Sequence, residues 1–396
     1  MFYKRDILPG LYRELSKKET IVITGMRQVG KTTILEHLFT KLESDNKAIL
    51  DAANPLHRSA FDENNYDKVI QNLRDYGLVS EKNAYVFIDE IQNMPEISKV
   101  IKYLYDHYAV KFLVTGSSSY YLKNLFSESL AGRKFVYELY PLTFREFLTF
   151  KQVDRKRQPA NTLESKAKGR NKLTQDLYGV YFNEYMNYGG FPGVVLEKDK
   201  IRKEKILDNI FKSYFEIDVK NLADFRNLSK LRDLILLLVP RIGSRLDISK
   251  LASELGISRE TVYSYLSFLE QTYFISMIPK YSKSFDRKSA GSKKLYYCDS
   301  GLANYLGRLS EGQFFENSVY QNLKTQYKEI CYFAKKSGAE IDFILNRKWG
   351  VEVKLSADKK HIGTVKRIAN KLGLQDGYVV SNKFLDEEGI ILSCDL

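Results

Sequence analysis

A glycine-containing loop between an apolar strand and an amphipathic helix is the feature that most constrains this sequence. The apolar run at residues 21–23 predicts a short buried strand, and apolar residues recur at helical spacing from Ile34 to Leu42. The loop between them fits the spacing G-x-x-x-x-G-K-S/T at Gly25, Gly30, Lys31 and Thr32. A strand, a loop and a helix in this order predict a doubly wound α/β domain with a parallel sheet.

The residue types of this loop suit a nucleoside triphosphate. Gly25 and Gly30 let the backbone turn tightly and aim N–H groups at phosphate oxygens. The helix that begins near Lys31 adds the positive end of its dipole, and the lysine can reach the β- and γ-phosphates. The Thr32 hydroxyl can ligate Mg²⁺, and Thr33 follows it in the same turn. We therefore expect these residues to bind ATP with Mg²⁺.

A second apolar strand, at residues 85–88, ends in Asp89 and Glu90. We expect Asp89 to hold the Mg²⁺ shell and Glu90 to orient and deprotonate the attacking water. Both acids are expected on the strand adjacent to the loop strand. The alternative is that they only cap a helix that begins near Pro95.

A third apolar strand, at residues 110–114, leads into a serine-rich turn. A polar group at this strand end could sense the γ-phosphate, with Ser117 as our candidate and Thr115 and Ser118 as alternatives. The turn could also be an ordinary one. Ligands of doubly wound sheets sit at the carboxyl ends of the strands, where all these side chains fall.

Several motifs together carry a resemblance to one family, at residues 24–33, 87–92, 113–119, 130–133 and 140–147. The chain resembles the prokaryotic AAA-14 family of AAA-type P-loop ATPases, whose members typically carry a C-terminal domain of the DUF4143 type. The resemblance implies that Arg133 neutralises transition-state charge, often across a subunit interface. The resemblance therefore also implies that the protein forms a homo-oligomer. The alternative is that Arg133 is a structural arginine on the surface. The segment 188–193 also matches, and physically it is a glycine-proline turn.

The middle of the chain changes character twice. Residues 151–175 are polar and basic, which predicts a solvated loop, with contact to nucleic acid as the alternative. Helical periodicity follows over 176–239 and predicts a helical lid. The pattern at 247–266 predicts a helix-turn-helix, with a helix end at Gly256 and an N-cap at Ser258.

Apolar residues 274–278 and the basic segment 282–294 would complete this helix-turn-helix as the strand and wing of a winged helix. In a DNA-binding interpretation, its second helix faces a major groove through Ser258, Arg259, Thr261 and Tyr263. In the alternative interpretation, the same fold is a protein–protein or lid element.

The C-terminal segment predicts an amphipathic helix at 314–323 and strands at 331–334, 339–345 and 350–355. On the last strand, Glu352 and Lys354 share one face, and Asp342 lies on the neighbouring hairpin strand. These side chains can therefore converge. The alternative is a hairpin with charges on its wet face.

This set resembles the core of the PD-(D/E)xK nuclease superfamily, with Glu316 as the helix acid. The resemblance implies a restriction-endonuclease-like α/β fold, in which two carboxylates hold Mg²⁺ and a lysine positions water. Ile341 stands where the motif has a proline, and that departure does not settle activity.

Composition adds weaker constraints. The formal net charge is +13 and the pI is near 9.2, which favours a nucleic acid or another polyanion as a partner, or only serves solubility. The cysteines are odd in number and widely spaced, at Cys298, Cys331 and Cys394, as in a reducing compartment. The apolar run 234–239 is far shorter than the roughly 18 residues of a membrane span, and the N-terminus lacks a signal-like apolar core. We therefore expect no membrane and a cytoplasmic location.

Taken together, the patterns and the two resemblances predict a P-loop AAA-type ATPase core at 1–150, a basic insertion and helical lid at 151–230, a winged helix at 231–298, and a PD-(D/E)xK nuclease-like domain at 299–396. The expected function is an ATP-binding, ATP-hydrolysing protein coupled to a nuclease-like, DNA-interacting C-terminal domain. The alternative is a nucleotide-switched regulatory or DNA-binding protein whose C-terminal domain does not cleave.

Overall fold

The computed structural model describes residues 2–81, 83–117, 132–155, 160–220, 225, 227–282, 292–335 and 338–396. The chain forms two compact units. The first unit comprises Met1–Tyr140, Ser213–Ala223 and Gln271–Tyr273, and the second comprises Pro141–Lys212, Asp224–Glu270 and Phe274–Leu396. The boundaries of these two units differ from those of the four domains predicted from the sequence. The four-domain division remains a prediction.

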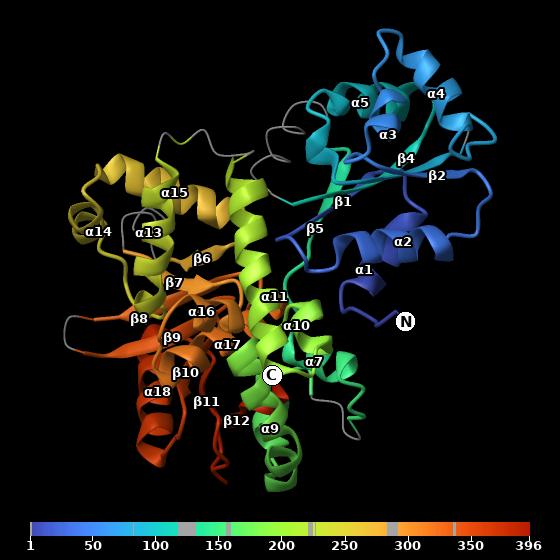
Figure 1. The fold of residues 1–396 in the computed structure, drawn as a ribbon. Coiled ribbons are helices and arrows are strands. Elements are labelled where there is room, and N and C mark those ends of the chain that lie inside the picture. Colours follow the sequence, from blue (N-terminus) through green and yellow to red (C-terminus); the bar gives the residue numbers. More distant parts are fainter. Residues whose placement is uncertain are drawn as a thin grey trace. The chain divides into compact units, whose positions relative to one another are not determined.

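A parallel sheet forms the centre of the first unit, in the order β2-β3-β4-β1-β5 (Figure 1). Its strands are β1 (Thr20–Thr24), β2 (Lys47–Asp51), β3 (Tyr85–Asp89), β4 (Lys111–Gly116) and β5 (Lys134–Glu138). The predicted strands at 21–23, 85–88 and 110–114 are confirmed. The central strands β1 and β4 are buried along their length, as expected for a sheet covered on both faces.

The expectation that Asp89 and Glu90 lie on the strand adjacent to β1 is wrong, because β4 pairs between β1 and β3. A strand pattern shows that a segment is buried but does not show which strand it pairs with. Since the strands are parallel, β1, β3 and β4 still end at the same edge of the sheet.

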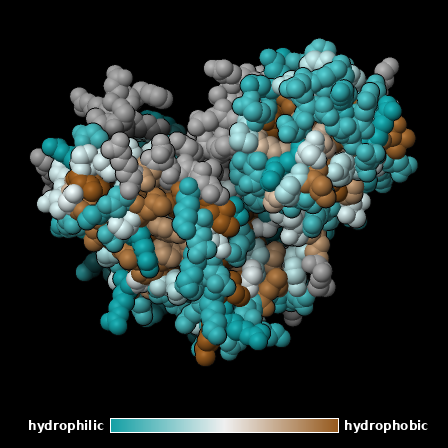
Figure 2. All heavy atoms as spheres, turned by 45° about the horizontal axis from the view of Figure 1, so that its top comes forward, coloured by the Kyte–Doolittle hydropathy of each residue, from teal (hydrophilic) through white to brown (hydrophobic). Residues whose placement is uncertain are grey.

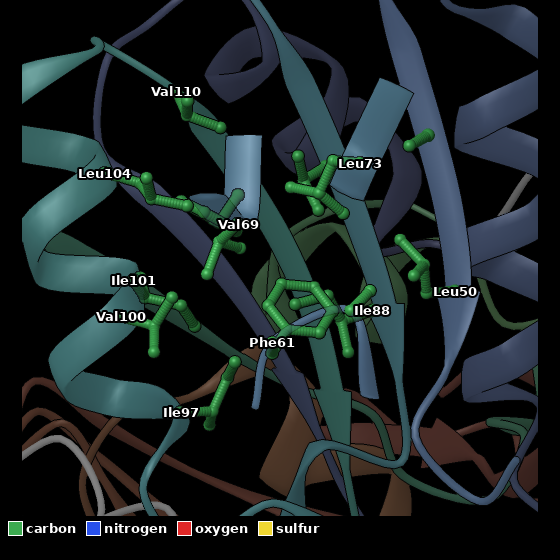
Figure 3. Packing of buried hydrophobic residues seen from close by; sticks show 14 of the residues in the cluster. Leu50, Phe61, Val69, Leu73, Ile88, Ile97, Val100, Ile101, Leu104 and Val110 are labelled. Atoms are coloured by element: carbon green, nitrogen blue, oxygen red, sulfur yellow. The ribbon is translucent and has the colours of Figure 1, made fainter. Parts of the chain in front are cut away.

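Helices cover both faces of this sheet. Figure 1 shows α1 and α2 on one face and α3, α4 and α5 on the other. Their bounds are α1 (Leu8–Leu15), α2 (Lys31–Lys41), α3 (Pro55–Ser59), α4 (Tyr66–Arg74) and α5 (Ile97–His107), with a short helical turn η1 (Ile91–Asn93). In Figure 3, Val69 and Leu73 of α4 and Ile101 of α5 point toward Ile88 of β3 and Leu50 of β2. This packed core holds the strand ends in place.

The π-helical segment η2 (Tyr214–Val219) also belongs to the first unit, although it follows helix α11 (Lys200–Ser213) of the second. The Tyr214 hydroxyl and the Thr272 hydroxyl lie 2.7 Å apart and share a hydrogen bond. The segments 213–223 and 271–273 are therefore in contact with each other within the first unit.

The second unit begins with helices α7 (Phe144–Phe150), α8 (Leu163–Lys168), α9 (Lys172–Tyr188), α10 (Pro192–Leu196) and α11 (Lys200–Ser213). The prediction of a solvated loop over 151–175 is wrong for residues 163–168 and 172–175, which are helical; residues 156–159 lie outside the described residues. Thr162 and Asn171 cap α8 and α9 by accepting backbone N–H bonds at 3.1 and 2.7 Å. Lys166 is buried and its Nζ donates to Gln326 Oε1 at 3.3 Å, because a lysine can bury its stem while its ammonium finds a partner.

A helical region and a small antiparallel sheet follow. Their elements are α13 (Leu228–Leu238), η3 (Val239–Arg241), α14 (Ile248–Leu255), α15 (Arg259–Gln271), β6 (Ile275–Ile278), β7 (Lys294–Tyr297) and α16 (Ser300–Leu306). The predicted helix end is confirmed, since Gly256 caps α14 with a φ of 64°. The predicted N-cap is confirmed by the bond from Thr261 N to Ser258 Oγ at 3.1 Å. Most of the expected wing, at 283–291, lies outside the described residues.

The C-terminal part of the second unit is a mixed sheet in the order β12-β11-β10-β9-β8. Its elements are α17 (Glu311–Gln326), β8 (Ile330–Ala334), β9 (Glu340–Leu345), β10 (Trp349–Lys354), α18 (Lys359–Leu372), β11 (Asp376–Ser381), β12 (Ile390–Leu392) and η4 (Ser393–Asp395). Strands β8, β9 and β10 are antiparallel, whereas β10, β11 and β12 run parallel. The helix predicted at 314–323 and the three predicted strands are confirmed.

The glycine-proline turn at 188–193 is a close-packed junction. A Cβ on Gly189, whose φ is +76°, would lie 1.9 Å from Asp299 Oδ1, and a Cβ on Gly190 would lie 2.3 Å from the Leu142 carbonyl oxygen. The buried Asp299 carboxylate accepts the backbone N–H bonds of Gly190 at 2.6 Å and of Leu302 at 2.8 Å. Packing therefore accounts for these glycines.

The visible face in Figure 2 is largely hydrophilic, with smaller apolar areas scattered over it. Within the described residues, no helix combines the length and apolar character needed to cross a membrane.

Candidate functional site

The loop after β1 is built by its glycines. Gly25 has a φ of +152°, and a Cβ there would lie 2.0 Å from the Leu139 carbonyl oxygen, so a side chain cannot be accommodated. Gly30 adopts the left-handed conformation, with a φ of 98°, as the N-cap of α2. The first turn of α2 therefore starts at Lys31 with its N–H groups directed toward the loop.

Lys31 is buried beneath this loop. Its Nζ donates to the carbonyl oxygens of Gly25 and Met26, both at 3.0 Å. Burial lowers the pKa of Lys31, while the carboxylates of Glu90, Asp218 and Asp89 act in the opposite direction. The net result is a pKa below the usual value for lysine, because the effect of burial outweighs that of the carboxylates.

Thr32 and Asp89 meet across the sheet edge. Thr32 Oγ1 donates to Asp89 Oδ2 at 2.6 Å, and the Thr115 hydroxyl donates to Asp89 Oδ1. Thr115 Oγ1 also accepts the backbone N–H of Glu90 at 3.1 Å. The ends of β3 and β4 and the start of α2 are thus joined through Asp89.

Glu90 directly follows β3 in a left-handed conformation, with a φ of 52°. The Gln92 amide donates to its Oε2, and Arg27 Nη2 lies 3.8 Å from the same oxygen. This conformation is uncommon for a residue with a side chain, and strained residues of this kind cluster at functional sites. The left-handed conformation of Glu90 turns its carboxylate toward Arg27 of the glycine loop.

Asp218 is a site residue that the sequence patterns missed. It lies on η2, far along the chain, and is 3% exposed. Its Oδ1 accepts the Arg27 Nε–H at 3.0 Å and the Ser117 hydroxyl at 2.9 Å. Burial raises the pKa of Asp218, and Arg27 and Ser117 oppose that rise. An isolated acid in a helical stretch gave no motif by which to find it.

Arg5 is a second residue that the sequence patterns did not identify, and it stabilises the glycine loop by a hydrogen bond to its backbone. Its Nη1 donates to the Val29 carbonyl and its Nη2 to the Tyr140 carbonyl, each at 2.8 Å. The side chain is buried. Because the N-terminal arginine has no motif of its own, only the folded chain reveals this contact.

The other predicted site residues are placed as follows. Ser117 is buried beside the site through Asp218 and Gln92, whose Oε1 accepts its N–H at 3.4 Å. Thr33 is exposed on the first turn of α2, and Ser118 lies outside the described residues. The structure does not bring Arg133 to this site. Its carbonyl accepts the Thr20 N–H at the opposite end of β1, and its Nε pairs with Asp106 at 3.2 Å. A role across a subunit interface remains a prediction.

The residues present fit a nucleotide–magnesium ligand. Thr32 and Asp89 bring a hydroxyl and a carboxylate together, and hard oxygen atoms of this kind are the ligands that Mg²⁺ prefers. The ammonium of Lys31 and the N-terminus of α2 lie in the same loop. The donor set thus combines a cation site with an anion site.

The second predicted cluster lies in the second unit, and its residues do converge. Lys354 Nζ pairs with Glu352 Oε1 at 2.7 Å, and Asp342 Oδ2 accepts the backbone N–H of Val353 at 2.9 Å. Burial raises the pKa of Glu316 to about 8 and that of Glu352 to about 7, with Asp342 adding to both shifts.

A lysine that was not predicted also enters this cluster. Lys294 Nζ lies 3.1 Å from Asp342 Oδ1, 2.7 Å from Glu340 Oε1 and 3.5 Å from Glu316 Oε1. An ammonium therefore contacts the carboxylates that would face Mg²⁺ in a nuclease. In this arrangement the residues do not fit a divalent metal ion, and among the described residues no group of three or more His, Cys, Asp and Glu side chains is arranged to hold one.

The helix-turn-helix lines an open pocket of about 780 Å³. Arg259 and Tyr263 of α15 contribute to its wall, together with Arg245 and Lys293. Tyr263 is 60% exposed. Ser258 and Thr261 are joined by the cap of α15, and their hydroxyl oxygens lie 3.1 Å apart.

Comparison with protein families finds three matches along the chain. The family described as "AAA domain" matches residues 17–148, the "Domain of unknown function (DUF8612)" matches 180–313, and the "Domain of unknown function (DUF4143)" matches 311–389. The parallel sheet, the glycine loop and the AAA domain define the first unit as a P-loop ATPase fold. The resemblances to an AAA domain and to DUF4143 are confirmed.

Curated relatives match most of the length of this chain. The chain belongs to the family of "Uncharacterized protein MJ1544" of Methanocaldococcus jannaschii, with 30% identity over 335 residues, 82% of this chain and 71% of that protein. An uncharacterized protein of Haemophilus influenzae is 28% identical over 349 residues, which cover 82% of this chain and 79% of that protein.

Solved structures show a distant likeness. The Walker-type ATPase PABY2304 of Pyrococcus abyssi has a TM-score of 0.49 and 14% identity, covering 77% of this chain and 96% of that chain. The ORC1 protein of Aeropyrum pernix, solved in complex with DNA, has a TM-score of 0.33 and 12% identity, covering 77% and 92%.

Proposed function

We propose that this protein binds ATP with Mg²⁺ and hydrolyses it at the carboxyl edge of the first unit's sheet. The observation that carries the proposal is the hydrogen bond of 2.6 Å between Thr32 Oγ1 and Asp89 Oδ2, formed directly beside the buried Lys31. A glycine loop alone binds many anions, whereas a loop joined to an acidic strand end can also orient a reaction.

Each side chain has a distinct role in this proposal. The backbone of the glycine loop and Lys31 bind the β- and γ-phosphates. Mg²⁺, held by Thr32 and Asp89, would neutralise charge on the phosphate oxygens. Glu90 orients the attacking water and accepts its proton, because its carboxylate faces the loop and is held by Gln92 and Arg27.

Arg27 and Ser117 are positioned by Asp218. The carboxylate accepts bonds from both side chains, so it holds a guanidinium and a hydroxyl at the end of β4. A charge-assisted pair of this kind fixes the direction of the guanidinium. Ser117 is then ready to sense the γ-phosphate through this arrangement, while Arg133 would act from a neighbouring subunit of a homo-oligomer.

For the second unit we propose a winged helix and a PD-(D/E)xK-like fold in a cytoplasmic, DNA-interacting protein. The order of α17, β8, β9, β10, α18 and β11, with an antiparallel meander followed by a parallel strand, supports the nuclease-like fold. Arg245, Arg259 and Lys293 line the pocket at α15 together with Asp247 and Glu270. These three basic side chains and the net charge of +13 support DNA as the partner. Lys294 in the carboxylate cluster favours the alternative in which this domain does not cleave.

Phosphate release by the full-length protein tests the ATPase proposal. Lys31→Ala should abolish Mg²⁺-dependent ATP turnover and weaken ATP binding at least tenfold, because the phosphates lose their buried cation. Lys41→Ala, at the far end of the same helix and exposed, is the matched control and should keep wild-type turnover. Unchanged turnover in Lys31→Ala would refute the assignment.

A further inference from the structure

Lys294 reaches the carboxylate cluster of the second unit from a separate sheet. It is the first residue of β7, where it pairs with Ile278 of β6, and a further bridge joins it to Arg245. Its backbone is therefore held from both sides. The side chain is 4% exposed, so the ammonium is removed from water and depends on protein partners.

The partners of this ammonium are carboxylates on two different elements. Glu340 and Asp342 lie on β9 at 2.7 and 3.1 Å, and Glu316 lies on α17 at 3.5 Å. A lysine ammonium has three N–H donors, and three carboxylates surround it here. Lys294 thus joins β7, β9 and α17 through a single charge.

Some oxygens of the cluster have further partners, whereas Glu352 Oε2 is buried without a hydrogen-bond partner among the described residues. Asp342 Oδ2 accepts the Val353 N–H, and Glu316 Oε1 accepts the Tyr296 hydroxyl at 2.7 Å. Lys354 Nζ forms an ion pair with Glu352 Oε1. A divalent ion needs several such oxygens at roughly 2.0–2.6 Å, and the ammonium both contacts them and repels a second cation.

We propose that Lys294 is a built-in cation that takes the place of a divalent metal between Glu316 and Asp342. The cluster is then an ion-pair junction that fastens β7 to the C-terminal sheet, and it is not a metal-dependent nuclease centre. The inference deepens the proposed PD-(D/E)xK-like fold of the second unit and does not depend on ATP turnover.

The proposal predicts two effects of replacing Lys294 by an uncharged residue, one on stability and one on metal binding. Removing the ammonium leaves buried carboxylates without compensation, which destabilises the fold. A divalent ion could then enter, since the same oxygens are hard ligands. Metal binding should therefore appear when the lysine is removed.

Mn²⁺ binding to the nucleotide-free, full-length protein, followed by electron paramagnetic resonance, tests this. The wild type should show no Mn²⁺ site that Asp342→Asn removes. Lys294→Met should gain a site at least tenfold tighter than any such site in the wild type, and the added Asp342→Asn change should abolish it. Mn²⁺ should also raise the melting temperature of Lys294→Met and leave that of the wild type unchanged.

Lys203→Met is the matched control. Lys203 is a buried lysine of the same unit whose Nζ pairs with Glu184 at 2.7 Å. Its replacement should lower stability without creating a Mn²⁺ site. If it gained the same site as Lys294→Met, the metal would not be reporting on the cluster, and the proposal would fail.

Two results on the wild type overturn the proposal even if Lys294→Met does not fold. One is a Mn²⁺ site that Asp342→Asn removes. The other is nicking of supercoiled DNA under Mg²⁺ or Mn²⁺ that Glu352→Ala removes. Because the Mn²⁺ titration contains no nucleotide, a failure of the ATPase proposal would leave these measurements interpretable.

Discussion

Both carboxylate oxygens of Asp89 accept hydrogen bonds from hydroxyl groups, those of Thr32 and Thr115. The Thr115 hydroxyl oxygen also accepts the backbone N–H of the neighbouring Glu90. One buried threonine thus orients the two acids for which we propose different roles, Asp89 as the metal ligand and Glu90 as the base. A substitution that keeps the shape of Thr115 and removes its oxygen should affect both acids.

Thr115→Val is such a substitution. It should lower the free energy of unfolding by about 2 kcal/mol, because a charge-assisted bond is lost and a buried N–H is left without its acceptor. Turnover of ATP should fall with it. Thr20→Val on β1 is the matched control, since the Thr20 hydroxyl is buried without a hydrogen-bond partner in the described part of the chain. Chemical denaturation measures both, and equal stability of the two variants would contradict the role of Thr115.

At the residue scale, the sequence identified the side chains that belong to a local motif. Lys31, Thr32, Asp89 and Glu90 each stand next to a strand or at a fixed spacing from a glycine. Asp218 could not be found in this way, because it meets Arg27 and Ser117 only after the chain has passed through the second unit. Lys294 escaped notice for the same reason, since its partners are distant in sequence.

The turn at 188–193 shows how elements are fitted together in the second unit. Gly189 and Gly190 lie at the end of α9, against the Asp299 carboxylate that begins α16. Helix α9 and α16 can pack only because no Cβ stands between them. The glycines are therefore expected to be intolerant of the smallest side chain.

Gly189→Ala should destabilise the second unit by about 3 kcal/mol or more, because the Cβ would overlap Asp299 and alanine is strained at positive φ. Gly193→Ala in the same turn is the control. A Cβ there would meet Ile206 at 3.7 Å, an ordinary contact, so we expect little change. Thermal unfolding followed by circular dichroism compares them, and a Gly189→Ala protein as stable as Gly193→Ala would contradict this packing.

Asp299 also predicts a pH dependence of stability. Burial raises the pKa of Asp299 to about 6, above the value of about 4 in an unfolded chain. Between these values the folded state holds the extra proton, so the contribution of Asp299 is greatest below pH 4 and is lost as the pH rises through 6. The loss should amount to about 3 kcal/mol. Denaturation of wild type and Asp299→Asn from pH 4 to 7 measures it; a stability difference that does not change with pH would refute this.

Elements with a clear period were predictable, and elements defined by capping within a charged stretch were not. The buried strands of the first unit and the strands near the C-terminus carry apolar runs or alternation. Helix α8 was mistaken for a solvated loop because its lysines dominate the composition, although Thr162 caps it and Lys166 is buried. The position of β4 between β1 and β3 is a pairing choice that no local pattern contains.

At the scale of the whole molecule, we propose that the first unit hydrolyses ATP and that the second unit interacts with DNA. Arg259→Ala combined with Lys293→Ala should weaken binding to duplex DNA and reduce the slope of log K against log salt by about 2, because two phosphate contacts are lost. Arg202→Ala, an exposed arginine on α11, is the control and should change neither. Fluorescence anisotropy at several salt concentrations measures both, and an unchanged slope in the double variant would place the DNA elsewhere.

The most direct test of the central claim is to separate ATP binding from ATP cleavage with Glu90→Gln. This change keeps the shape of the side chain and removes its ability to take a proton from water. Calorimetric titration with ATP and Mg²⁺ should show binding within about threefold of wild type, while phosphate release falls at least a hundredfold. A Glu90→Gln protein that hydrolyses ATP at the wild-type rate would contradict the account.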